Sequence, residues 1–348
     1  MKLGLALDYA VPRLEVPLDL VRHAEARGFH SVWSAEAYGS DAITPLAWLA
    51  GQTRSIRLGT ALAQISARVP TMLAMQLATL DQLAGGDRVI GGIGLSGPQV
   101  VEGWHGVAWA RPGARLRDYT AIVRKTLARS EPVRHDGEGL SLPYAGPDAS
   151  GLGKPLKSIL HMNDGIPLWL GTGSRANVAL TAEIADGWIP MGFAPGMMSL
   201  YGPWLEEGFA RAPGDKSLRD FEIFCPVQVD LTPDVRGAID RRKIQAAMYV
   251  GGMGAKEKNF HADQMARRGF PEAAQKIGEL FRAGQQAQAL AAVPDEYIEQ
   301  QTLIGPPERI RDLFRRWEGS GATGMICHLG EGDHFALVEL LAGLGDRS

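Results

Sequence analysis

The sequence contains little cysteine: two residues in 348, Cys225 and Cys327, which lie far apart and each inside an apolar run. A disulfide framework needs more cysteines at closer spacing, so both are expected to be reduced core residues. The sequence also lacks the CxxC and HxxxH spacings that are typical of metal sites. We therefore expect no metal, even at residues 327–334 (CHLGEGDH), where cysteine, histidine and acidic residues occur together.

Neither sign of charge is in excess, because 36 lysines and arginines face 39 acidic residues and the formal net charge is −3. There is no electrostatic reason to expect nucleic acid or an anionic membrane as a partner. No apolar run reaches the length of a membrane span. The apolar stretch within residues 1–12 (MKLGLALDYAVP) is too short for a signal peptide. These absences predict a soluble cytoplasmic protein.

What the sequence does contain is a repeated alternation of helical patterns and short apolar runs. Helical patterns closed by glycine occupy residues 18–28 and 71–86, among others. Runs rich in Val, Ile and Leu occur at 2–7, 31–36, 56–65, 88–95, 167–172, 187–193, 222–231 and 324–330. Helix, glycine and buried strand in this order are typical of βα units around a parallel sheet. Eight such strands predict an α/β fold, a single (β/α)8 TIM barrel spanning residues 1–348.

Two gaps between the predicted strands are longer than a barrel needs. Residues 131–166 are rich in proline and glycine and contain a hairpin signal at Asp136-Gly137, whereas residues 234–300 carry extra helical patterns. We expect these to be insertions after strand 4 and strand 7, both on the βα side, where barrels carry their functional loops. The first would then be a lid over the active site.

A glycine motif follows the fourth apolar run, in which Gly92, Gly94 and Gly97 match the dinucleotide fingerprint GxGxxG. A Rossmann unit also needs a second strand ending in Asp or Glu about 20 residues later. No such strand occurs before residue 167, so the dinucleotide interpretation is disfavoured. Two interpretations remain: a βα loop that offers the amides of Ser96 and Gly97 to a ligand, or glycines that fit the taper of a barrel.

A second glycine-rich stretch, GTGSRANV at residues 171–178, joins the fifth strand to a helix. The helix N-terminus offers free amides and a partial positive charge, and an arginine adds a cation, so the pattern indicates a phosphate site. The alternative is an ordinary N-cap by Ser174. The candidate phosphate-binding residues are Gly171, Thr172, Gly173, Ser174 and Arg175.

Several stretches together resemble the bacterial-luciferase-like superfamily, and within it the branch of oxidoreductases that depend on the deazaflavin coenzyme F420. The resemblance runs in order from residue 1 to about residue 330 through SVWSAEAY, IRLGTALAQISAR, GGIGLSGPQVVEGWHG, GLGKPLK, AEIADGWIP and LIGPPERI. It implies a (β/α)8 barrel that binds F420 or FMN at the C-terminal ends of the strands, in many members as a homodimer. It also implies that the cofactor phosphate lies at residues 171–175.

In this family the second strand ends in an acid followed by histidine, beside the reacting ring of the cofactor. Here Glu36 supplies the acid, but Ala37 stands where the histidine would be. An alanine cannot transfer a proton, so any proton must come from another group. The candidates are Glu36, Tyr38, Asp41 and, from the loop after the fourth strand, His105.

The resemblance also implies a non-prolyl cis peptide at the end of the third strand, where a bulge backs the cofactor ring. The matching stretch is Thr60-Ala61-Leu62-Ala63. From its position at the end of the first strand, Asp8 is expected to line the floor of the pocket. Besides the phosphate residues, the predicted cofactor-binding set is therefore Asp8, Glu36, Thr60, Ala61, Leu62, Ser96 and Gly97.

The leading hypothesis is an F420-dependent oxidoreductase that transfers a hydride between the deazaflavin and a small organic substrate, with the protein supplying position and desolvation. One alternative is an FMN-dependent monooxygenase that receives reduced flavin from a partner flavin reductase. A further alternative is a non-catalytic flavin-binding barrel, motivated by Ala37. The sequence predicts neither the substrate nor the choice between these cofactors.

Overall fold

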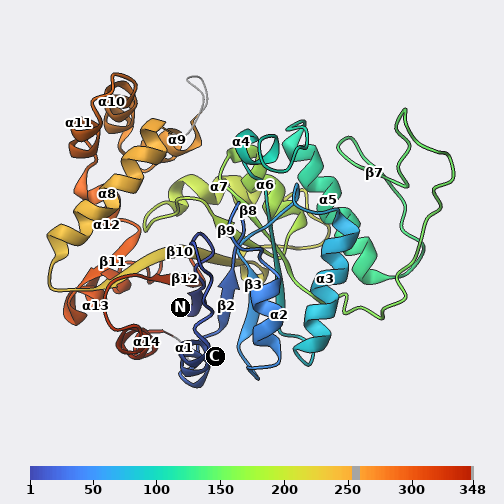
Figure 1. Ribbon diagram of the computed structural model, residues 1–348, viewed down its shortest axis with the longest axis horizontal. Helices are drawn as coiled ribbons and strands as arrows, with labels where there is room; N and C mark the ends of the chain where they lie inside the picture. The colour runs from blue at the N-terminus through green and yellow to red at the C-terminus, as the bar shows by residue number, and fades with distance from the viewer. Residues whose placement is uncertain (253–258, 346–348) are drawn as a thin grey trace.

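The structure, a computed structural model, describes residues 1–252 and 259–345. Eight parallel strands close into a barrel, and the predicted fold is confirmed (Figure 1). The long strand β10 completes the closure, because Glu222 and Ile223 pair with β9 while residues 224–229 pair with β12. The strands are β1 (Lys2–Ala6), β2 (Ser31–Ser34), β3 (Arg57–Thr60), β5 (Val89–Gly94), β8 (Leu168–Thr172), β9 (Gly187–Pro190), β10 (Glu222–Leu231) and β12 (Gly324–Leu329).

Large aromatic side chains fill the inside of the barrel. Trp33, Trp169 and Phe224 are buried and have ring centroids 4.9 to 5.8 Å apart. They need glycine on the neighbouring strands, since a Cβ at Gly4 or Gly59 would lie within 2.4 Å of the Trp33 ring. This packed layer closes the barrel interior, so a ligand site can form only beyond the strand ends.

Helices surround the barrel, and glycines in the left-handed region end several of them, as at Gly28 and Gly85. The helices of the βα units are α1 (Leu18–Ala26), α2 (Thr44–Ala50), α3 (Pro70–Leu83), α5 (Pro112–Ala128), α6 (Arg175–Ile184), α7 (Met198–Phe209), α13 (Pro307–Arg315) and α14 (His334–Ala342). Short elements lie between them: β4 (Ala63–Gln64), which pairs with β5, α4 (Pro98–Val101) and the 3-10 helix Leu218–Asp220. Within the described residues no helix is both long and apolar enough to cross a membrane.

The insertion at residues 131–166 lies between helix α5 and strand β8, not between a strand and its helix as predicted. It contains the hairpin β6 (His135–Asp136) and β7 (Ser141–Leu142), and it follows α5 rather than a barrel strand. Asp118 of α5 holds the hairpin by accepting hydrogen bonds from His135 and from the Gly139 and Leu140 amides. The prediction that it falls on the βα side is therefore wrong, and none of these residues lines the main cavity. The structure gives the predicted lid no support.

The second insertion follows β10 directly, on the βα side as predicted, and lies across the barrel from the first (Figure 1). It has a hydrophobic core of its own, built around Ile239, Met265 and Ile277. Its helices are α8 (Val235–Gly252), α9 (Phe260–Arg267), α10 (Pro271–Arg282), α11 (Gln286–Ala291) and α12 (Asp295–Glu299). After them, β11 (Thr302–Gly305), a strand that the sequence analysis missed, pairs with the end of β10.

Two partly buried histidines predict how stability depends on pH. Burial is the main cause that lowers the pKa of His30 and of His328 from 6.5 to about 4. Between pH 6.5 and 4 the unfolded chain thus binds protons that the folded chain does not, so stability falls as the pH falls. The slope is at most about 1.4 kcal/mol per pH unit for each histidine.

We expect the free energy of unfolding in urea to be lower at pH 5 than at pH 7. Replacing both histidines, His30→Gln and His328→Gln, should reduce this difference. A difference of the same size in the double variant would contradict the assignment.

Candidate cofactor and substrate site

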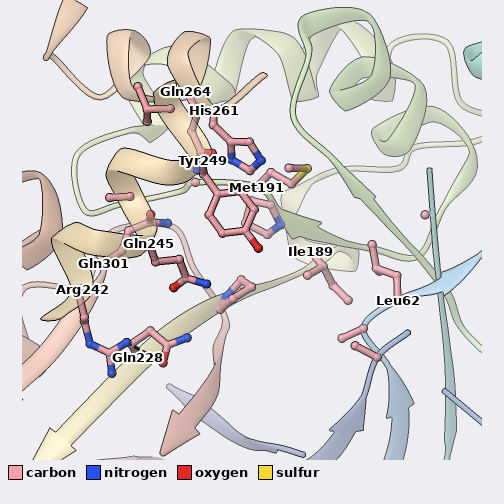
Figure 2. A pocket seen from close by; sticks show the side chains of 18 of the residues that line it. Leu62, Ile189, Met191, Gln228, Arg242, Gln245, Tyr249, His261, Gln264 and Gln301 are labelled. Atoms are coloured by element: carbon pink, nitrogen blue, oxygen red, sulfur yellow. Dashed lines mark hydrogen bonds between the residues drawn. The ribbon is translucent and has the colours of Figure 1, made fainter. Parts of the chain in front are cut away.

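A cavity of about 530 Å³ lies beyond the C-terminal ends of the barrel strands, between the barrel and the helical insertion. Its floor comes from the ends of β3 to β5 and of β9, and its wall from α8, α9 and α12. Figure 2 shows Tyr249 and His261 pointing from the insertion toward the strand ends that carry Leu62 and Ile189. The helical insertion therefore forms the wall that the sequence analysis expected a lid to provide.

The floor of the cavity includes a non-prolyl cis peptide bond between Ala61 and Leu62, which confirms the prediction made for this stretch. Two glycines of the GxGxxG motif make room for it. A Cβ at Gly92 would lie 1.8 Å from the Thr60 carbonyl oxygen, and one at Gly94 would lie 2.4 Å from Leu62. The motif therefore serves packing beneath the bulge. Ser96 lines the cavity and Gly97 does not.

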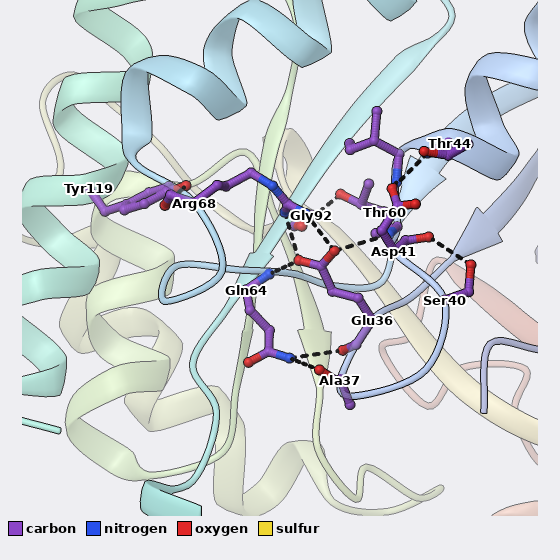
Figure 3. Close-up of polar contacts among 12 residues, drawn as sticks. Glu36, Ala37, Ser40, Asp41, Thr44, Thr60, Gln64, Arg68, Gly92 and Tyr119 are labelled. Carbon is purple, nitrogen blue, oxygen red and sulfur yellow. Dashed lines mark hydrogen bonds and ion pairs between the residues drawn. The ribbon is translucent and has the colours of Figure 1, made fainter. Parts of the chain in front are cut away.

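Glu36 lies beside this bulge and holds it in place (Figure 3). Its two carboxylate oxygens form a bidentate ion pair with Arg68, at 2.6 Å to each guanidinium nitrogen. The same oxygens accept hydrogen bonds from the backbone N–H of Gln64 at 2.7 Å and the backbone N–H of Ala42 at 3.0 Å. The side chains of Glu36 and Arg68 are 6% and 12% exposed.

This network also stabilises the charge of Arg68. Although burial opposes a charged guanidinium, the hydrogen bonds and charge of Glu36 raise the pKa of Arg68. Four donors occupy the two carboxylate oxygens of Glu36, so neither oxygen is left to face a bound molecule. The geometry therefore favours a positioning role for Glu36 over the proton donation predicted from sequence.

The other predicted proton donors lie outside the cavity. Tyr38 is 64% exposed, and Asp41 accepts hydrogen bonds from the Ile43 and Thr44 amides at the start of α2. His105 does not line the cavity, and its Nε2 is buried without a hydrogen-bond partner among the described residues. Asp8, predicted at the pocket floor, is exposed and does not line the cavity either.

Most of the remaining residues of the predicted cofactor set contact other residues of the barrel and do not line the cavity. Thr60 is buried and donates a hydrogen bond to the Gly92 carbonyl at 2.7 Å. A Cβ at Gly171 would lie 2.0 Å from Leu62, and the Thr172 hydroxyl bonds that of Thr181 at 2.8 Å. The structure thus brings Glu36, Ala61, Leu62 and Ser96 together around the cavity.

The predicted phosphate loop lies next to the cavity at the N-terminus of α6. Ser174 occupies the N-cap position, but its side chain makes no capping hydrogen bond. Arg267 of α9 donates a hydrogen bond to the Gly173 carbonyl, and Arg175 forms only an exposed pair with Glu207 at 3.3 Å. The loop thus has two cations close by, of which the sequence analysis identified one. Gly173 adjoins the cavity through Met191.

The sequence analysis missed the polar residues of the wall. One signal was available, because Arg242, Gln245 and Tyr249 recur at helical spacing and share one face of α8. The residues it did not find are Tyr9, Gln64, Gln228, Arg242, Gln245, Tyr249, His261, Gln264, Arg268, Tyr297, Gln301 and Thr302.

Burial shifts the pKa of several groups in this wall. It lowers the pKa of His261, which is therefore neutral at pH 7, and the His261 ring lies 4.6 Å from that of Tyr249. Burial, together with the charges of Tyr249 and Tyr38, raises the pKa of Tyr9. Histidine and tyrosine are groups that can carry a proton to or from a bound molecule.

The fold and this cavity define a (β/α)8 barrel protein with a cavity at the C-terminal strand ends, where barrels of this kind carry their active sites. The family model described as "Luciferase-like monooxygenase" matches residues 2–324. The chain therefore belongs to this family, as the sequence analysis predicted.

The chain is also similar to individual proteins of known name. The chain is 45% identical over 336 residues to the Mycobacterium tuberculosis protein named "Putative coenzyme F420-dependent oxidoreductase Rv3520c", covering 96% of each chain. It is 24% identical to the 5,10-methylenetetrahydromethanopterin reductase of Archaeoglobus fulgidus, covering 88% of this chain and 87% of the relative. Among solved structures, the coenzyme F420 dependent tetrahydromethanopterin reductase from Methanopyrus kandleri shares the fold, with a TM-score of 0.76, 22% identity and 99% and 97% of the two chains covered.

Proposed function

We propose that this protein is an F420-dependent oxidoreductase that transfers a hydride between the deazaflavin ring and a small organic substrate. The name of the 45% identical relative supports the choice of cofactor. The observation that carries the proposal is the cavity floor, where the Ala61–Leu62 bulge lies beside Ile189 and the buried Oε1 of Gln64 has no partner among the described residues.

The residues present fit this cofactor. Leu62, Ile189 and Met191 form an apolar surface on which a flat ring can lie. The unpartnered oxygen of Gln64 can accept a hydrogen bond from a ring N–H, which would remove the cost of a buried, unsatisfied acceptor. Gly173, Ser174 and the α6 N-terminus, with Arg175 and Arg267, would hold the phosphate.

When bound, F420 supplies the carbon that gives or takes the hydride. The chain supplies position and a dry surface: Glu36 and Arg68 fix the bulge, and the helical insertion covers the strand ends. A proton must move when an alcohol and a carbonyl interconvert, and Ala37 cannot carry it. We assign this step to His261, which is neutral and lies in the cavity wall beside Tyr249.

The phosphate assignment is tested at Gly173. Replacing Gly173 with leucine should weaken F420 binding at least about tenfold, because the side chain would fill the space before the α6 amides and remove charge-assisted hydrogen bonds. A Cβ here would lie 3.3 Å from the Met191 Cβ, so Met191 must shift by a few tenths of an ångström, and a urea unfolding curve checks that the variant folds. Titration followed by tryptophan fluorescence measures the affinity, and an unchanged affinity would remove the loop from the site.

Turnover tests the function itself. Protein mixed with reduced F420 and a panel of aldehydes, ketones and enones should regenerate the visible absorbance of the oxidised deazaflavin with at least one class. Bound F420 that is never oxidised or reduced across the panel would instead favour the non-catalytic barrel.

We further propose that the protein is a homodimer. Several large apolar side chains on α2 and α3 and before α3 are exposed, and monomers rarely leave such a surface uncovered. They are Trp48, Val69, Met72 and Met75. Sedimentation should give a dimer at micromolar concentration, and a monomer would contradict the proposal.

A further inference from the structure

Arg268 is a buried arginine in the wall of the cavity, directly after α9. The residue is 6% exposed, and its guanidinium lies 3.9 Å from the centre of the Tyr297 ring. Its Nε donates to the Gln300 side chain at 3.1 Å, and its other nitrogens donate to the Gln301 side chain and the Tyr297 carbonyl. All of these partners are neutral.

The charge of Arg268 has no counterion in the described residues, since no carboxylate forms an ion pair with it. Burial lowers its pKa to about 10, which still leaves it positive at pH 7. A buried, unpaired charge is costly unless something compensates it. The other two charged groups of the cavity wall are compensated, Glu36 by Arg68 and Arg242 by Asp230.

A second buried arginine, Arg88, provides a comparison, because all of its hydrogen-bond donors are used within the protein. Arg88 makes five hydrogen bonds, to carbonyls of Thr53, Ile56 and Ala84 and to the Thr53 hydroxyl. A guanidinium has five N–H groups, so Arg88 is saturated. Arg268 makes three such bonds and lines a cavity, which leaves donors for a ligand.

A hydroxyl lines the same cavity directly after Gln301, the residue whose side chain accepts a hydrogen bond from Arg268. Thr302, the first residue of β11, is 5% exposed, and its Oγ1 is buried without a hydrogen-bond partner among the described residues. A hydroxyl can donate to an anion. Arg268 and Thr302 thus bring a cation with free donors and an unused hydroxyl to the same cavity.

We propose that Arg268 and Thr302 form an anion subsite that binds a carboxylate or phosphate group of the substrate. The phosphate loop at Gly173, with Arg175 and Arg267, would already hold the cofactor phosphate, which leaves Arg268 to the substrate. The substrate class is then an organic acid or phosphate ester with a reducible or oxidisable carbon. This assignment of the substrate rests on the proposed function, whereas the anion subsite itself does not.

The subsite is tested by binding of simple anions. Inorganic phosphate and succinate are titrated by calorimetry into the Gly173→Leu variant, in which the other anion loop is blocked, and into the same variant carrying Arg268→Gln. We expect Arg268→Gln to weaken anion binding at least about tenfold, as loss of a charge-assisted hydrogen bond would. Equal binding in both would overturn the subsite.

Three controls keep the result interpretable. Thr302→Val should weaken anion binding about threefold without affecting the arginine, which keeps the test open if Arg268→Gln does not fold. Arg268→Lys should restore only part of the affinity, since lysine lacks the planar fork. F420 affinity should change less than twofold in Arg268→Gln. A loss equal to that for phosphate would place the cofactor tail at Arg268 and overturn the substrate assignment.

The experiments distinguish failure of the proposed function from failure of the anion subsite. If F420 did not bind the wild-type protein at all, the anion titrations would still report on Arg268, because they use no cofactor. If F420 bound and turned over but anion affinity did not depend on Arg268, the proposed function would be retained. The anion subsite would then be rejected.

Discussion

Replacing Glu36 with glutamine is expected to destabilise the protein by about 3–5 kcal/mol, because breaking a buried ion pair leaves the partner charge uncompensated. Arg68 would be that partner, with its side chain 12% exposed. The change would also place an amide N–H against one of the four donors that now point at the carboxylate. Urea unfolding measures the loss. Cofactor affinity should fall as well, because the Gln64 amide that follows the bulge would lose its anchor.

A matched control exists at the surface. Glu15 pairs with Arg13 at 3.7 Å, and the two side chains are 79% and 88% exposed, so Glu15→Gln should cost no more than about 1 kcal/mol. The double variant Glu36→Gln with Arg68→Met should recover part of the lost stability, since it removes the stranded charge. Equal costs for Glu36→Gln and Glu15→Gln would refute the positioning role of Glu36.

Replacing His261 with glutamine is expected to lower kcat by about 10²–10⁴-fold, the range typical of a lost general acid or base. Affinity for F420 should change little, because glutamine keeps a hydrogen-bonding side chain in the wall. In the direction of alcohol oxidation, neutral His261 would accept the proton, so activity should fall as the pH drops through its pKa. Burial lowers that pKa, which places the acidic limb of the wild-type pH profile below pH 6.5.

His105 provides the control, because it is a histidine near the strand ends that does not line the cavity. His105→Gln should leave both kcat and the acidic limb unchanged. The opposite pattern, in which His105→Gln removes activity and His261→Gln does not, would return the proton transfer to the residue predicted from sequence.

The fold could be predicted because its signals are local and repeated. Buried strands such as residues 222–231 and glycines that end helices recur through the chain, and one βα unit looks like the next. Periodicity does not say on which side of a helix an insertion begins. Residues 131–166 were therefore placed on the wrong side of α5, and the four-residue strand β11, directly after the predicted helical insertion, was not recognised.

The candidate site was predicted only where it touches the barrel. Ala61 and Leu62 were found through the family resemblance, and the structure places them in the cavity floor. The packing roles of Gly92 and Gly94 could not be predicted from the sequence. They arise because a side chain at either position would clash with Thr60 or Leu62, which lie at the end of a strand about 30 residues earlier in the chain. His261 and Arg268 belong to the insertion, where tertiary packing alone brings them to the strand ends.

The central claim is tested most directly by titrating the wild-type protein with F420 and, separately, with FMN while recording tryptophan fluorescence. Trp33 and Trp169 lie in the barrel interior beneath the cavity, so a bound ring should alter their emission. We predict a saturable response to F420 at one equivalent per chain and a much weaker response to FMN. Tight binding of FMN with no response to F420 would contradict the account and indicate a flavin monooxygenase.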